Sequence, residues 1–172
     1  NDFGITFIVV THDQEEALVM ADRIAILKDG ALLQCGSPQD IYERPVNRYA
    51  ADFIGVMNFL PGHVSNGQII GITGEPITAT LPETMADGAQ VVAAVRPERV
   101  HLDPASSDNT LKGRVTAMAY HGLDLQLHVE TPASPEQVMV RLTADAAEAR
   151  PLSIGDTIKL GWSAENTRIF AA

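Results

Sequence analysis

One histidine stands out among the residues that could do chemistry, because of what lies on either side of it. His12 follows the apolar run Phe7-Ile8-Val9-Val10 and precedes Asp13 and, three residues further on, Glu16. This pattern predicts a buried strand that ends at the histidine and turns at once into a helix. In open α/β sheets, phosphate-bearing ligands bind at the carboxyl ends of strands, beside helix N-termini. His12 is therefore a candidate contact for a phosphate group.

The elements that must position His12 can be read from the same stretch. Four consecutive apolar residues at 7–10, three of them β-branched, are typical of a strand covered on both faces, as in a parallel sheet. Asp13 is the predicted N-cap of a short helix over 14–21, and Glu16 is placed to reach back in a capping box. Glu15 and Glu16 also favour the first turn of that helix electrostatically.

Other candidate residues are fewer and less specific. Arg96-Pro97-Glu98 follows a predicted strand, so Arg96 and Glu98 could contact a ligand or a partner subunit, or form a surface ion pair that stabilises little. The remaining histidines lack the close spacing of a zinc site, and no metal site is expected. Trp162 and Phe170 are expected in the core or in an interface.

Composition excludes several classes of protein. The formal net charge of −10 argues against a nucleic-acid binder, which needs a basic surface. No run approaches the roughly 18 apolar residues of a membrane span, and the first residues do not form a signal peptide. Cys35 is the single cysteine, so no disulfide within the chain is possible. The first residue is not Met, which suggests a chain cut from a longer one.

The period of the apolar residues divides the chain near residue 55. Before it, strands are predicted at 23–27 and 31–35 around the hairpin signal Asp29-Gly30, followed by helices at 38–43 and from Asn47 to Gly55. After it, short strands broken by turn residues predict a small barrel or sandwich. The predicted strands are 59–64, 68–72, 77–81, 91–96, 100–102, 112–120, 124–129, 137–142, 157–160 and 168–170.

The first third of the chain resembles the switch-histidine region of an ABC transporter ATPase. The resemblance rests on Val10–Ala17, Ala21–Ala25, Gly36-Ser37-Pro38 and Phe53-Ile54-Gly55. It implies that the residue at the position of His12 contacts the γ-phosphate of ATP and helps to orient the attacking water. The resemblance thus assigns His12 as the one catalytic candidate, within an intact ATPase.

The later part resembles the β-barrel module of import-type ABC ATPases, called the TOBE domain. The carrying residues are 94–100, Gly113-Arg114-Val115, Tyr120-His121-Gly122 and the segment around Trp162. The expected fold is therefore mainly β: an OB-like barrel (TOBE) preceded by the α/β end of an ABC ATPase domain. The expected domains are 1–55, the C-terminal end of the nucleotide-binding domain, and 56–172, a TOBE-like regulatory domain.

A phosphate-binding loop of the type Gly-x-x-x-x-Gly-Lys-Ser/Thr does not occur in the 172 residues. We therefore expect this fragment not to hydrolyse ATP and to bind no cofactor, whereas the resemblance implies ATP and Mg²⁺ in the intact protein. It further implies a cytoplasmic subunit on the inner face of the cell membrane. The implied partners are a second copy of the subunit, inner-membrane permease subunits and, indirectly, an extracytoplasmic solute-binding protein. The solute, a sugar or a polyamine, stays open.

Two hypotheses from other classes remain at this point. One is a free-standing β-barrel that binds a small ligand such as an oxyanion, which titration of residues 56–172 with molybdate, sugars and polyamines would test. The other is an oligonucleotide-binding barrel of OB type. The acidic balance of the chain and the lack of paired surface aromatics argue against the second.

Overall fold

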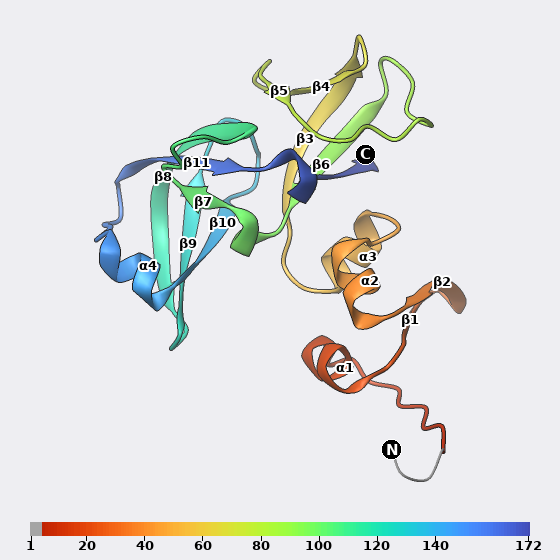
Figure 1. Ribbon diagram of the computed structural model, residues 1–172. Coiled ribbons are helices and arrows are strands. Elements are labelled where there is room, and N and C mark those ends of the chain that lie inside the picture. The colour runs from red at the N-terminus through yellow and green to blue at the C-terminus, as the bar shows by residue number, and fades with distance from the viewer. Residues whose placement is uncertain (1–4) are drawn as a thin grey trace. The chain divides into compact units, whose positions relative to one another are not determined.

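A computed structural model describes residues 5–172, which separate into two compact units on either side of the boundary between Gly55 and Val56 (Figure 1). Each unit has a hydrophobic core of its own. All strand pairings within the described residues are antiparallel. No helix in residues 5–172 combines the length and apolar character needed to cross a membrane.

The first unit consists of short helices around one hairpin. Its elements are α1 (Gln14–Met20), β1 (Ile24–Lys28), β2 (Ala31–Gly36), α2 (Pro38–Glu43) and α3 (Arg48–Phe53). The turn between β1 and β2 places Asp29 and Gly30 at φ 51° and 79°, the left-handed pair that a tight hairpin requires. Ser37 and Asn47 cap α2 and α3 through their side chains, as the sequence predicts. The core joins Ile24 and Ile26 of the hairpin to apolar residues of α2 and α3.

The predicted strand at 7–10 is wrong for this structure. Residues 5–11 form no strand, and the side chains of Phe7 to Val10 are 72% to 96% exposed. The physical reason is the lack of a neighbour: β1 and β2 hydrogen-bond each other and leave no parallel strand beside this segment. The α/β fold expected for residues 1–55 is therefore not evident. A helix does follow the apolar residues, as predicted, but the apolar residues form no strand.

The second unit is built almost entirely of strands, so the predicted mainly-β class is confirmed. It contains β3 (Asn58–Ser65), β4 (Gln68–Gly71), β5 (Pro76–Ile77), β6 (Gln90–Val95), η1 (Pro97–Arg99), β7 (His101–Leu102), β8 (Asn109–Tyr120), β9 (Asp124–Glu130), β10 (Val138–Thr143), α4 (Ala144–Ala149), β11 (Thr157–Trp162), η2 (Ala164–Asn166) and β12 (Arg168–Ala171). The predicted strand at 77–81 is reduced to the two residues of β5.

These strands form two five-stranded sheets with corresponding orders, β12-β6-β3-β4-β5 and β7-β11-β8-β9-β10. The sheets exchange a strand: β7 follows β6 in the chain but pairs with β11, and β12 follows β11 but pairs with β6. One closed OB-like barrel, as the sequence analysis expected, is therefore not observed. The strands form two open sheets instead, and each sheet takes one edge strand from the other half of the unit.

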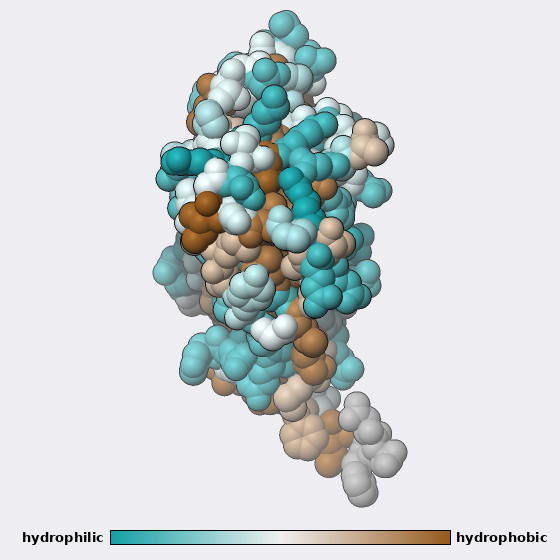
Figure 2. All heavy atoms as spheres, turned by 90° about the vertical axis from the view of Figure 1, so that its left-hand side faces the viewer, coloured by the Kyte–Doolittle hydropathy of each residue, from teal (hydrophilic) through white to brown (hydrophobic). Residues whose placement is uncertain are grey.

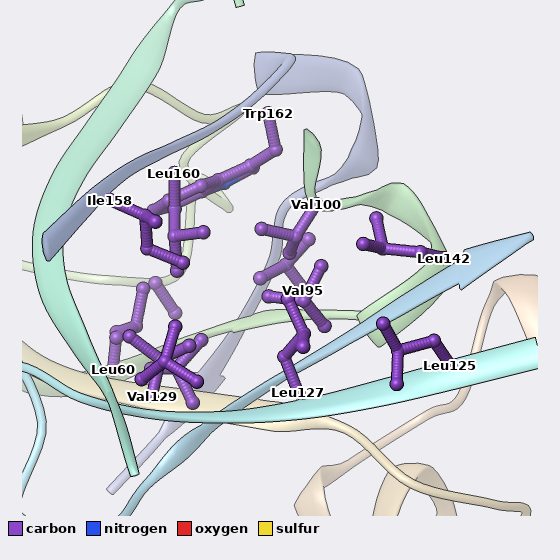
Figure 3. Close-up of a cluster of buried hydrophobic side chains, with 14 residues drawn as sticks. Leu60, Val95, Val100, Leu125, Leu127, Val129, Leu142, Ile158, Leu160 and Trp162 are labelled. Atoms are coloured by element: carbon purple, nitrogen blue, oxygen red, sulfur yellow. The ribbon is translucent and has the colours of Figure 1, made fainter. Parts of the chain in front are cut away.

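The two sheets bury one shared core (Figure 3). Leu60 and Val95 come from the first sheet, while Leu127, Leu160 and Trp162 come from the second, and their side chains point toward one another. Leu127 and Leu160 are fully buried, and Trp162 is 3% exposed. This arrangement accounts for the alternation in β9, where Leu125, Leu127 and Val129 all face the core.

Candidate functional site

His12 lies at the solvent-exposed junction between the extended segment and α1. Immediately after it, Asp13 caps the helix, because its Oδ1 accepts a hydrogen bond from the backbone N–H of Glu16 at 3.0 Å. The predicted capping box is modified: the Glu16 carboxylate accepts from the hydroxyl of Thr11 at 3.2 Å, and Thr11 in turn accepts from the N–H of Asp13 at 2.9 Å. These bonds fix the backbone on both sides of the imidazole.

This geometry leaves the imidazole of His12 open to a group that approaches from solvent. The apolar side chains before it are equally open, and Figure 2 shows hydrophobic residues at the surface at this N-terminal end of the chain. A run of four exposed apolar residues is unusual for a folded surface. His12 thus lies directly before a capped helix, as predicted, and its contact with a phosphate stays a prediction.

Arg96 and Glu98, the other predicted site residues, occupy different environments. Arg96 is 4% exposed, and its Nη1 donates a hydrogen bond to the carbonyl oxygen of Val56 at 3.1 Å. Glu98 is half-buried in η1, directly after the core residue Pro97. Arg96 is thus buried rather than at the surface, and its guanidinium ties the end of β6 to the chain segment that enters β3. Contact of Arg96 or Glu98 with a ligand or a partner subunit stays a prediction.

The rest of the described chain offers no clustered chemistry. Within residues 5–172, no group of three or more His, Cys, Asp or Glu side chains could hold a metal ion. Trp162 and Phe170 are buried as expected, and the indole Nε1 of Trp162 donates to the hydroxyl of Thr167 at 3.0 Å. Cys35 is exposed on β2.

Two buried asparagines, which the sequence analysis did not single out, link the two sheets. Asn58 begins β3, and its amide both donates to the carbonyl of Met139 and accepts from the N–H of Met139, each at 2.7 Å. Asn109 begins β8 and makes the same two bonds to the backbone of Thr78, at 2.8 and 2.7 Å. Each side chain therefore makes the two hydrogen bonds that a neighbouring strand would otherwise make at an edge of the opposite sheet.

A repeated motif accompanies the two asparagines. The pattern Asn-x-Leu-x-Gly-x-Val occurs at Asn58–Val64 and again at Asn109–Val115. The repeat extends to the pairing of the strands: Gly62 lies opposite Gly71 at the end of β4, while β8 pairs in the corresponding register with β9. The second unit thus contains the same arrangement of strands twice. In each sheet one edge strand comes from the other copy: β12 completes the first sheet and β7 completes the second. A search of the sequence for internal repeats could have found this signal.

Comparison with known proteins identifies relatives for both units. Residues 93–170 match the family model of the TOBE domain. The spermidine/putrescine import ATP-binding protein PotA of Pseudomonas fluorescens is 44% identical over 91% of this chain and 43% of the relative. Proteins of the same name from Ruegeria pomeroyi and Rubrobacter xylanophilus are 40% and 38% identical over 96% and 98% of the chain. The chain spans less than half of the length of these relatives.

Among solved structures, the cytoplasmic molybdate-binding protein ModG with molybdate bound is similar in fold. The match has a TM-score of 0.57 at 18% sequence identity and covers 75% of this chain and 99% of ModG. At that identity the likeness concerns the fold alone.

Proposed function

We propose a function from one premise: the chain belongs to the family of ABC-importer ATP-binding proteins of the PotA type, corresponds to their C-terminal region, and carries a TOBE domain. In our proposal, the intact protein couples ATP hydrolysis to the uptake of a polyamine such as spermidine or putrescine, the solutes in the names of the relatives. Residues 56–172 serve dimerisation and regulation. A sugar as solute, which the sequence left open, becomes the less favoured alternative.

The single observation that carries the proposal is the exposed segment that ends at His12. Four apolar side chains and one imidazole lie open to solvent beside a capped helix, as they would if a neighbouring part of an ATPase domain were meant to cover them. In that setting His12 contacts the γ-phosphate of ATP and orients the attacking water. Residues 1–55 are then the C-terminal end of the nucleotide-binding domain, and the intact protein binds ATP and Mg²⁺.

The assembly follows from the same proposal. The subunit works in the cytoplasm on the inner face of the cell membrane, as a pair of copies bound to permease subunits, with an extracytoplasmic solute-binding protein as an indirect partner. Nucleic acid is not a partner, since the net charge of −10 would repel the phosphate backbone. Arg96 and Glu98 remain candidates for contact with a ligand or a partner, and Arg96 also donates a hydrogen bond to the carbonyl oxygen of Val56 within the fold.

A chimera tests the role of His12. The N-terminal part of the Pseudomonas fluorescens relative, fused ahead of this chain, should give a protein that hydrolyses ATP, whereas the 172-residue chain alone should not. His12→Ala in the chimera should lower the hydrolysis rate by about 10²-fold, the cost of misplacing the attacking water, while ATP binding persists. His121→Ala, at an exposed hairpin tip, is the matched control. Full hydrolysis by the His12→Ala chimera would refute the assignment.

Uptake assays test the solute. The chimera, expressed in cells whose own polyamine-importer ATPase is deleted, should restore uptake of labelled spermidine or putrescine and should not restore sugar uptake. Restored sugar uptake alone would contradict the polyamine assignment. The alternative of a free-standing oxyanion-binding module predicts instead that residues 56–172 bind molybdate in a titration. The shared fold with ModG does not by itself favour that outcome.

A further inference from the structure

β12 leaves one edge of the first sheet open. It is the last strand in the order of that sheet and pairs with β6 alone (Figure 1). The N–H of Ala172 donates to the carbonyl of Gln90, and the alternation of an antiparallel ladder then turns the backbone groups of Ile169 and Ala171 away from β6. Among residues 5–172, no hydrogen bond reaches these outward N–H and C=O groups. Ala171 is exposed and Ile169 is half-buried, so β12 offers a further strand two successive pairing positions.

The opposite edge of the same sheet, β5, is closed to a further strand. Because Gly71 donates to the carbonyl of Glu75, the same alternation turns Pro76 and Thr78 outward. Pro76 has no N–H to donate. The amide of Asn109 holds both the N–H and the C=O of Thr78. The first sheet therefore has a single open edge.

The edges of the second sheet offer less than β12. At β10, the amide of Asn58 holds both backbone groups of Met139, and the strand runs directly into α4. β7 has two residues, and Asp103 directly after it has a φ of 40°, outside the range of a strand. One open edge has a consequence for assembly. Two copies that pair through it close the interface, whereas sheets open at both edges could add copies without limit.

We propose that β12 pairs antiparallel with β12 of a second copy, so that the first sheets of two copies join into one sheet. The proposal names the surface for the dimerisation given above, and it therefore rests on the proposed function. In the register that uses both outward positions, Ile169 of each copy lies opposite Ala171 of the other, and each such pair exchanges two N–H···O=C bonds. The twofold axis then passes between the two Phe170 residues, and Arg168 of each copy lies opposite Ala172 of the other.

This pairing is weak in the isolated chain and stronger in the intact subunit. One short strand from each copy covers far less than the about 1,600 Å² of a standard stable interface. In the proposed importer, the two ATPase domains hold the edges near each other, at an effective concentration on the order of millimolar. The edge then fixes how the two second units face each other. Covalent trapping, which captures a weak complex, is therefore a better readout than mass.

Disulfide trapping tests the register in the 172-residue chain. Cys35→Ser removes the native thiol, and Ile8→Lys with Val10→Lys suppresses association through the first segment. Two proteins with this background carry one cysteine each, Arg168→Cys or Ala172→Cys. On mild oxidation, their equimolar mixture should give a mixed disulfide dimer, because the two positions face each other across the pair. Each protein alone should give at least about tenfold less, since like positions lie roughly 13 Å apart along the strands.

Proline at the outward position supplies the control for the backbone. Ala171→Pro removes an outward N–H without touching the ladder to β6, and it should abolish the mixed dimer. Ala171→Ser keeps the N–H and should trap as before, and circular dichroism checks that both variants fold. Trapping that is equal in the mixture and in the single proteins, or that survives Ala171→Pro in a folded protein, would overturn the proposal. The assay needs neither ATP nor a permease, so its failure is distinct from a chimera that does not hydrolyse ATP or restore uptake.

Discussion

The side-chain amide of Asn58 hydrogen-bonds both backbone groups of Met139, 81 positions away in the sequence, at 2.7 Å each. Asn58 is 4% exposed, so water cannot easily replace either bond. Met139 lies on β10, the edge strand of the second sheet, whereas Asn58 begins β3 of the first. This side chain, like that of Asn109, thus links two sheets that share a core but no backbone ladder.

Replacing Asn58 tests how much these two hydrogen bonds contribute to the stability of the second unit. Asn58→Ala should destabilise the second unit by about 1–3 kcal/mol, because the N–H and C=O of Met139 lose their partner. Asn58→Asp should cost more, since a carboxylate keeps the acceptor but brings a buried charge against the carbonyl of Met139. Urea denaturation followed by the fluorescence of Trp162, the single tryptophan, measures both. Gln68→Ala, an exposed position on β4, should change stability by no more than about 0.5 kcal/mol. An Asp variant as stable as the Ala variant would contradict this account.

The glycines of the repeated motif give a second prediction. A Cβ at Gly62 would lie 2.5 Å from the carbonyl oxygen of Ile70, and one at Gly113 would lie 2.6 Å from that of Glu130. Backbone oxygens cannot move aside without opening the hairpin, so alanine at either position should cost about 1–3 kcal/mol or more. Gly71→Ala is the control, because its nearest neighbour is 3.5 Å away. The same denaturation assay applies, and equal effects at Gly71 and Gly113 would argue against close packing as the cause.

How far the sequence predicts this structure depends on the range of the interactions. Local signals succeed: the Asp29-Gly30 turn, the caps Ser37 and Asn47, and the alternation in β9 all lie where they were predicted. These features depend on residues close together in the chain. The predicted strand at 7–10 was wrong because a strand needs hydrogen-bonding neighbours, which its own residues do not supply.

Features that depend on residues far apart in the chain were not predicted, for a related reason. β7 consists of only two residues. Their sequence does not indicate that β7 pairs with β11 rather than with the strand before it. For Arg96 the sequence left a ligand, a partner and a surface ion pair open, and its hydrogen bond to the carbonyl oxygen of Val56 inside the fold was not predicted. The asparagine links are visible in the sequence only through the repeated Asn-x-Leu-x-Gly-x-Val motif. The role of His12 stays a prediction, because no contact of residues 5–172 tests it.

Asp40 provides a prediction on pH. The hydroxyl of Ser37 donates to its Oδ2 at 2.7 Å, and this bond, followed by the pairing with Arg44, holds the pKa of the carboxyl below its ordinary value of 3.8. A lowered pKa means that the charged carboxylate favours the folded state. The stabilisation is therefore present above pH 3.8 and is lost as the pH falls through the lower, folded-state pKa.

Amide hydrogen exchange in α2 measures this effect. Exchange should accelerate in the wild type as the pH drops below 3.8, after correction for the intrinsic rate, and Asp40→Asn should show faster exchange already at neutral pH with no such step. Asp52→Asn removes the same charge from an exposed position on α3 and should keep the wild-type profile. A wild-type profile in the Asp40→Asn protein would show that the capped start of α2 does not depend on the carboxylate.

The exposed segment before His12 makes the isolated chain prone to associate. Ile8 and Val10 are 89% and 96% exposed, and an uncovered apolar segment with unpaired backbone groups invites pairing with another copy. Light scattering should therefore show a mass that rises with protein concentration. Ile8→Lys with Val10→Lys should restore a monomer, whereas Gln68→Lys with Thr84→Lys, which adds the same charge elsewhere, should not. A strict monomer of the unmodified chain would contradict the prediction. If the segment is covered in the intact ATPase, fusing the N-terminal part of a relative should suppress this mode of association as effectively as the two lysines do.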